Sequence, residues 1–249
     1  MPRYLLTIEY CGTGLVGWQR QRNGLSVQEA LETAIENFCG ESVRVFGAGR
    51  TDAGVHALAQ AAHVDLPRAY DPEIIRSAVN HHLRPHAISV IAAEPASADF
   101  DARHSATQRH YLYRILNRRA PPALDRFRVW HVAPPLDLAA MQEGARYLVG
   151  HHDFSTFRDS LCQAKSPVKT LDALDLTRAG EEIHIAARAR SFLHHQVRNM
   201  VGTLKLVGLG QWRPEEVARA LLARDRRAGG PTAPAAGLTL TLVRYDRDQ

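Results

Sequence analysis

The sequence predicts an α+β protein made of two halves with a cleft between them. Segments with the two-residue period of strands and segments with the 3.6-residue period of helices occur in both halves of the 249-residue chain. The two kinds of segment do not alternate uniformly, and no strict repeat is present, which favours an α+β arrangement. We place the domain boundary within Phe100–Ala106 and expect domains at residues 1–104 and 105–249.

The first half is expected to contain a short β-like run at residues 43–46, three further strands and two helices. Tyrosine and aliphatic side chains alternate over residues 4–10, which is typical of a strand. Ser26 and Glu29 form a capping box that begins the first helix. The apolar stripe of that helix consists of Val27, Ala30, Leu31, Ala34, Ile35 and Phe38. Two further strands are expected at residues 58–66 and 88–92. A helix that opens with Asp-Pro-Glu is expected to begin at residue 71.

The second half begins with a clear strand pattern, RHYLYRIL, at residues 109–116. A hairpin is expected over residues 171–189, with its turn near Ala179–Gly180. Asp137 caps one helix, and a second helix carries an apolar stripe from Leu193 to Leu204. Arg198 lies off that stripe. A short helix and a final strand are expected at residues 214–223 and 238–245, separated by the compositionally loose segment RRAGGPTAPAAG.

Charge and cysteine usage limit the class of protein. The chain has 31 basic and 26 acidic residues and a sequence pI of about 9.4. A polyanionic partner is therefore plausible, although charge alone does not identify RNA. The three cysteines are widely spaced and form neither a disulfide framework nor a Cys-x-x-Cys metal site, which favours a reducing cytosol. No apolar run is long enough to span a bilayer, so a protein that is soluble and not exported is expected.

One short motif, FGAGRTDAGVHA, points to chemistry. It does not fit the dinucleotide-binding pattern, because Asp52 occupies the position of the third glycine. It does not fit the phosphate-binding loop either, because Val55 and His56 stand where lysine and serine or threonine are required. Taken alone, Asp52 could be an ordinary turn or helix-capping residue. The motif by itself leaves this alternative open.

Several segments together resemble one family. In order along the chain they are YCGTGLVGWQRQ, SVQEAL, GAGRTDAGVHA, FDARHSATQRHYLYRI, DFSTFR and SFLHHQVRNMVG. This set is similar to the TruA-type tRNA pseudouridine synthases. The resemblance implies largely antiparallel sheets that flank a central RNA-binding cleft, and a cytoplasmic homodimer that needs neither metal nor cofactor. It also implies that uridines on the 3′ side of the tRNA anticodon stem-loop are isomerised to pseudouridine.

The same resemblance assigns roles to four side chains. Asp52 becomes the catalytic carboxylate, acting as a nucleophile or as a base at the ribose. A buried aspartate tends to protonate, so a cationic neighbour is needed, and the family pattern places Arg198 there. At ~4 Å and an effective dielectric constant of ~20, such a pair attracts by about 4 kcal/mol. The resemblance also implies that Tyr111 stacks on the flipped base and that Arg50 enters the RNA and stabilises the extruded state.

Five more residues are candidates for contacts with RNA phosphates, although basic runs are usually only solvated surfaces. They are Arg103, His104, Lys165, Arg118 and Arg119. The paired histidines have no metal-binding spacing, and we expect them to be structural or to face RNA. Two other functions stay open: a non-catalytic tRNA-binding protein, and an enzyme that acts on a small nucleoside with the same carboxylate. A pure binder should tolerate the loss of Asp52, and activity on free uridine should depend little on salt.

Overall fold

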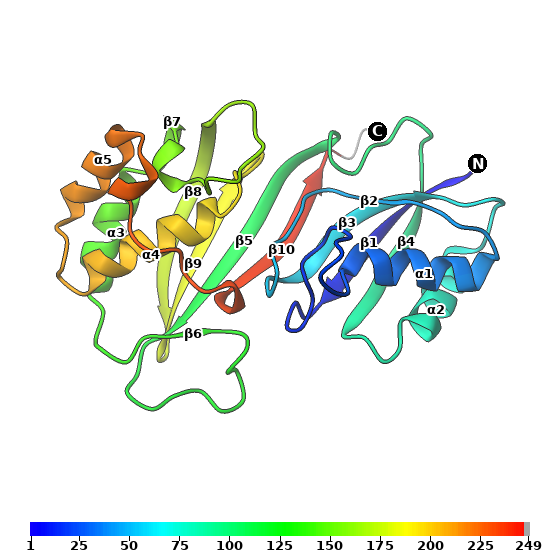
Figure 1. Cartoon of the computed structure of the whole chain (residues 1–249), viewed down its shortest axis with the longest axis horizontal. Helices are drawn as coiled ribbons and strands as arrows, with labels where there is room; N and C mark the ends of the chain where they lie inside the picture. Colours follow the sequence, from blue (N-terminus) through cyan, green and yellow to red (C-terminus); the bar gives the residue numbers. More distant parts are fainter. Residues whose placement is uncertain (247–249) are drawn as a thin grey trace. The chain divides into compact units, whose positions relative to one another are not determined.

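The computed structural model describes residues 1–246 and divides into two compact units (Figure 1). Unit 1 comprises residues 1–107 and the segment from Thr239 onward, and unit 2 comprises residues 108–238. The expected division at residue 104 lies close to the first crossing of the chain between the units. The final strand, which we expected in the second domain, belongs to unit 1.

Unit 1 contains a sheet with the strand order β4-β1-β3-β10, and a short strand, β2, that pairs with β3. The strands of this unit are β1 (Arg3–Tyr10), β2 (Val45–Gly47), β3 (His56–Asp65), β4 (Ile88–Ala96) and β10 (Leu238–Tyr245). The pairs β1–β3, β1–β4 and β2–β3 are antiparallel, whereas β3 and β10 are parallel, with Thr239 opposite His56. The chain returns to β3 from a position about 180 residues later in the sequence, which no local pattern announces.

Two helices pack on this sheet and on each other, α1 (Val27–Cys39) and α2 (Pro72–Leu83) (Figure 1). The Ser26 side chain accepts a hydrogen bond from the Glu29 backbone, as the capping pattern predicts, and Gly40 ends α1 in the left-handed conformation. The predicted strand alternation is also confirmed, because Tyr4, Leu6, Ile8 and Tyr10 are all buried.

Unit 2 contains an antiparallel sheet with the order β5-β9-β8-β7, and β6 pairs with β5 in parallel. Its strands are β5 (Ala106–Leu116), β6 (Trp130–His131), β7 (Gly150–Asp153), β8 (Val168–Ala179) and β9 (Glu182–Ala189). The β8–β9 turn lies at Gly180, as predicted. The α+β class and the largely antiparallel pairing are therefore confirmed.

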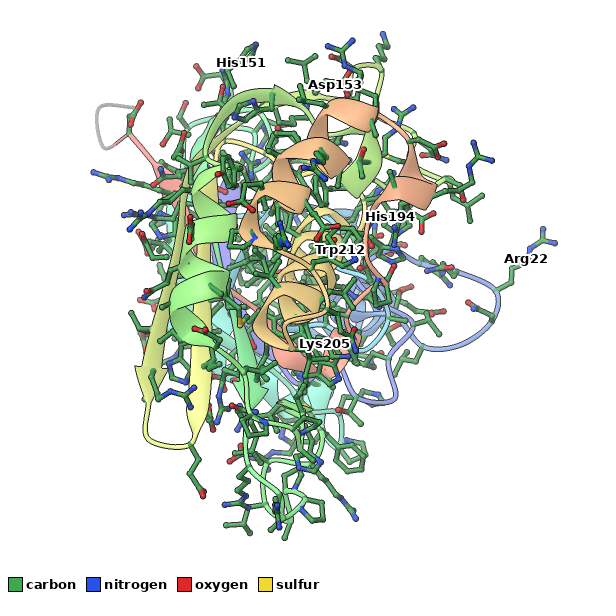
Figure 2. The ribbon with its side chains drawn as sticks, turned by 90° about the vertical axis from the view of Figure 1, so that its left-hand side faces the viewer. Arg22, His151, Asp153, His194, Lys205 and Trp212 are labelled. Atoms are coloured by element: carbon green, nitrogen blue, oxygen red, sulfur yellow. The ribbon has the colours of Figure 1, made fainter. Side chains whose placement is uncertain are left out.

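Three helices accompany the sheet of unit 2, α3 (Leu138–Arg146), α4 (Gln196–Gly208) and α5 (Pro214–Ala223), and Figure 2 shows them in front of its strands. Short 3₁₀ turns lie at Ser155–Phe157, Arg226–Ala228 and Ala235–Gly237. In Figure 2, His194 marks the start of α4 and Lys205 lies near its other end. Among the described residues, no helix has the length and apolar character needed to cross a membrane.

The compositionally loose segment that follows α5 is tied to α4. Arg226 donates to the Gly230 carbonyl and to the Asn199 side chain, and the Gly230 N–H donates to the Thr203 hydroxyl. Further along, the Ala233 N–H donates to the Arg198 carbonyl at 3.1 Å. The segment therefore fixes the face of α4 that carries Arg198.

Candidate active site

The motif containing Asp52 forms the connection between β2 and β3. The Val55 N–H donates to the Asp52 carbonyl at 3.1 Å and closes a tight turn. Gly54 has φ 80°, the left-handed value that the third position of a type II turn requires. Asp52 is half-buried and Arg50 is exposed, so this turn holds the backbone while both charged side chains reach its surface.

A buried hydroxyl pair holds the centre of this turn. The Thr51 hydroxyl lies 2.7 Å from the Tyr10 hydroxyl, and the Thr51 carbonyl accepts a hydrogen bond from the Trp18 N–H at 3.0 Å. Thr51 is only 6 % exposed and Tyr10 only 3 %. Hydrogen bonds fix both the side chain and the backbone of Thr51. Thr51 therefore positions its two neighbours in the chain, Arg50 and Asp52.

Gln60, a buried residue of β3, stabilises the turn through hydrogen bonds. Its amide nitrogen donates to the Gly49 carbonyl at 2.9 Å and to the Tyr10 hydroxyl at 3.5 Å. Its amide oxygen has no hydrogen-bond partner among the described residues. Burial raises the pKa of Tyr10 to about 12, although the bonds to Thr51 and Gln60 act in the opposite direction. Tyr10 therefore remains a neutral hydroxyl at physiological pH.

The loop that follows β1 packs directly against the far side of the turn. A Cβ atom at Gly12 would lie 2.1 Å from the Val55 carbonyl oxygen, so only glycine permits this approach. The Gly12 N–H donates to Nδ1 of His56 at 3.0 Å, which identifies Nδ1 as an acceptor. Trp18 is buried against Gly47. His56 and Trp18 thus shape the motif.

Tyr111 and Tyr113 share one face of β5 but occupy different environments. Tyr113 is fully buried and donates its hydroxyl proton to the Pro234 carbonyl at 2.7 Å. Tyr111 is half-buried, and its ring forms a T-shaped contact with the Phe192 ring at 5.2 Å between centroids and an interplanar angle of 89°. Tyr113 is therefore part of the core, whereas Tyr111 retains exposed ring surface on unit 2.

Arg198 lies on α4 and is oriented by the segment that follows α5. Its Nε donates to the Ala233 carbonyl at 2.8 Å, using one of the five N–H donors of the guanidinium. Burial raises the pKa of Tyr113 above its ordinary value, and the positive charge of Arg198 acts in the opposite direction. The Arg198 charge is thus held on a half-buried part of unit 2 by hydrogen bonding to the backbone.

The residue before α4 has a strained backbone that a carboxylate holds in place. His195 has φ 60°, which is uncommon outside glycine, and its Nδ1 lies 2.7 Å from a carboxylate oxygen of Asp159. Partial burial acts to raise the pKa of Asp159, but hydrogen bonds from the Leu161 backbone and from His195 outweigh it and lower the pKa. The ionised form of Asp159 is therefore favoured beside His195, where it fixes the entry into α4.

The candidates for RNA contacts are distributed over both units. In unit 1, the backbone N–H groups of Arg103 and His104 donate to the Asp101 carboxylate, and both side chains are exposed. In unit 2, Lys165 and Arg119 are exposed. Arg118 is half-buried and forms an ion pair with Glu181 at 2.7 Å, and Nδ1 of His104 lies 3.0 Å from a carboxylate oxygen of Asp101.

The structure places Arg50 and Asp52 on one turn of unit 1, and it places Tyr111 and Arg198 in unit 2. The sequence patterns did not predict a role for Gln60 or for the Asp159–His195 pair. Gln60 has a visible signal, since it is a polar residue flanked on both sides by alanines in the stretch ALAQAAHV. The Asp159–His195 pair has none, because its partners are 36 residues apart in the chain.

Comparison with known proteins places the sequence among RNA-modifying enzymes. A family model described as "tRNA pseudouridine synthase" matches residues 6–105 and 145–246. Relatives named tRNA pseudouridine synthase A include that of Paramagnetospirillum magneticum, 64% identical over 98% of this chain and 96% of its own. Those of Rhodospirillum centenum and Parvibaculum lavamentivorans are 63% and 56% identical, over 98% and 99% of this chain and all of their own.

We predict that the Tyr10 and Thr51 hydroxyls are energetically coupled. Tyr10→Phe leaves a buried hydroxyl without this partner and should lower the free energy of unfolding by about 1–2 kcal/mol. Combined with Thr51→Val it should cost less than the sum of the two single changes, by about 0.5–1.5 kcal/mol in urea unfolding. Tyr4→Phe combined with Thr51→Val is the control. It should be additive because Tyr4 bonds to Tyr70 instead.

Proposed function

We infer the function of this chain from the family to which it belongs, the tRNA pseudouridine synthases, and propose that it isomerises uridine to pseudouridine in tRNA. The observation that carries the proposal is the Arg50–Asp52 turn, which lies inside the matched segment and is fixed by buried hydrogen bonds. A rigid turn that presents one carboxylate suits a reaction that needs a single precisely placed acid–base or nucleophilic group.

The reaction requires no external group. The bond between uracil N1 and ribose C1′ breaks, the base turns, and a bond forms between C5 and C1′. The hydrogen on C5 leaves as a proton, and N1 ends with a proton, so atoms and electrons balance without a change of redox state. We propose that Asp52 is the carboxylate in this sequence, either as a nucleophile or as a base at the ribose.

Asp52 has to be ionised for either role, and a nearby cation favours the charged form of a carboxylate. We propose that Arg198 supplies this charge. The bond from Arg198 Nε to the Ala233 carbonyl supports the idea, because it orients the guanidinium before substrate arrives. A pre-oriented charge costs less reorganisation during the reaction than a mobile one.

A stacked uridine has to leave the RNA helix before it can react, which costs a few kcal/mol. We propose that Tyr111 stacks on the extruded base and that Arg50 enters the RNA to stabilise the extruded state. Phe192 supports the first role, because its edge-to-face contact fixes the Tyr111 ring. The exposure of Arg50 beside Asp52 supports the second. Stacking of a base on an aromatic ring contributes about 1–3 kcal/mol.

The remaining expectations concern partners and location. We propose that the substrate site is the 3′ side of the anticodon stem-loop, that the enzyme is a cytoplasmic homodimer, and that it uses no cofactor. Arg103, His104, Lys165 and Arg119 have the exposure needed to contact phosphates. Arg118 is a weaker candidate, because it would first have to leave Glu181.

The function predicts a specific change in nucleoside composition. Incubation of an unmodified tRNA transcript with the purified protein and EDTA should convert uridine into an equal amount of pseudouridine. The mass of the RNA should not change, because the two nucleosides are isomers. Enzymatic digestion followed by chromatography measures both nucleosides. Binding of the transcript without loss of uridine would contradict the proposed activity, and activity that requires added metal would contradict the cofactor-free mechanism.

The charge proposal predicts that Arg198→Ala loses turnover but keeps its affinity for tRNA. Loss of about 3–4 kcal/mol of attraction corresponds to a decrease of roughly 100- to 1000-fold in turnover at saturating tRNA. Arg198→Lys should recover part of the rate by restoring the charge. Arg219→Ala, an exposed change on α5, is the control and should behave as the wild type. A fully active Arg198→Ala enzyme would exclude this role.

A further inference from the structure

A long loop of unit 2 connects β5 to β6 and carries exposed basic and apolar side chains. Figure 1 shows it extending past the strands near β6. We call residues 118–128 of this connection the arginine loop, because it contains Arg118, Arg119, Arg126 and Arg128 and only one acidic residue, Asp125. No motif in the sequence explains this segment.

The base of the loop is firmly anchored. The Asn117 amide nitrogen donates to the carbonyls of Val132 and Pro134 at 2.9 and 2.7 Å, and its oxygen accepts from the Leu136 N–H. Nε2 of His131 lies 2.8 Å from the Arg118 carbonyl. The loop is thus an extension of the sheet with both ends clamped, which limits the entropy lost when it binds a partner.

The charged side chains of the loop differ in whether they form ion pairs. Asp125 lies 3.5 Å from the guanidinium of Arg114, so the single acidic group of the loop is already paired. Among the described residues, Arg119, Arg126 and Arg128 are exposed and have no ion-pair partner. Three unpaired guanidinium groups on one loop fit an anionic partner.

Apolar groups are interleaved with these charges. Phe127 is 48 % exposed and Leu124 is 98 % exposed. The Arg126 guanidinium lies over the Phe127 ring at 4.5 Å from its centroid. Arginine beside an exposed aromatic ring is a combination that binds nucleic acid, because the guanidinium pairs with phosphate and the ring stacks on a base.

The strand geometry sets how far the loop lies from the proposed base-stacking residue. Tyr111 and Asn117 are six residues apart along β5, which corresponds to about 20 Å at ~3.3 Å per residue. One strand of a DNA duplex advances ~3.4 Å per nucleotide along its axis, and we use this spacing as an order of magnitude for RNA. The loop therefore reaches nucleotides several positions away from any base held at Tyr111.

We propose that the arginine loop is a tRNA-binding element that contacts phosphates, and one base or ribose, at a distance from the reacting uridine. The proposal rests on the proposed function of the chain, because tRNA is the anionic partner that function supplies. It makes the loop a contributor to affinity and salt dependence, and it assigns the loop no part in the chemistry.

The test compares Arg126→Gln/Arg128→Gln with a control of equal charge change, Arg68→Gln/Arg219→Gln, whose arginines are exposed between β3 and α2 and on α5. Binding of the unmodified tRNA transcript is measured from 50 to 200 mM salt. The loop variant should bind roughly tenfold more weakly at the lower salt, and its slope of log affinity against log salt should decrease by about 1.4–1.8. The control should keep the wild-type slope.

A second variant separates stacking from charge. Phe127→Ala should weaken tRNA binding several-fold without changing the salt slope, because stacking is not ionic. The rate of isomerisation at saturating tRNA should stay at the wild-type value in both loop variants. If the wild-type protein fails to isomerise uridine, the proposed function is wrong, but the binding test of the loop still applies. Equal slopes for the loop variant and the control would overturn the proposal. If the loop variants bind tRNA as the wild type does but sediment with a different mass, the proposal is wrong, and the loop binds a second copy of the chain instead.

Discussion

The hydrogen bond between the buried hydroxyls of Tyr10 and Thr51 is the contact on which the proposed site depends. The proposed reaction relies on the position of one carboxylate, so it requires a rigid backbone at Asp52. Tyr10 extends from the first strand and Gln60 from the third, and together they fix the turn at Gly49 and Thr51. The core of unit 1 therefore determines the position of a surface group.

In unit 2, backbone hydrogen bonds restrict the side chain of Arg198. Its charged candidate, Arg198, lies on a helix, where a long side chain has many rotamers. The backbone of the segment after α5 removes part of this freedom by accepting a hydrogen bond from Arg198 at Ala233. The left-handed His195, held by Asp159, sets where that helix begins. Residues 226–237, which their composition predicts to be a loose loop, thus help to orient Arg198.

Most of the secondary structure could be predicted from the sequence, because periodicity and caps are local signals. The helix after Ser26 and the strand around Tyr111 follow from such signals. The parallel pairing of β10 with β3 could not be predicted, since it depends on residues far apart in the chain. The role of Asp52 required the family resemblance, because a turn aspartate has the same local pattern whether or not it reacts. Gln60 was missed because its partners, the Gly49 carbonyl and the Tyr10 hydroxyl, lie 11 and 50 residues away in the chain.

The most direct test of the account is the release of tritium from tRNA labelled at uracil C5, with wild-type protein and Asp52→Ala compared on the same unmodified transcript. This hydrogen has to leave when C5 bonds to the ribose. The account predicts release by the wild type, none above background by Asp52→Ala, and similar tRNA binding by both. Release by Asp52→Ala at the wild-type rate would contradict the central claim and return Asp52 to the status of an ordinary turn residue.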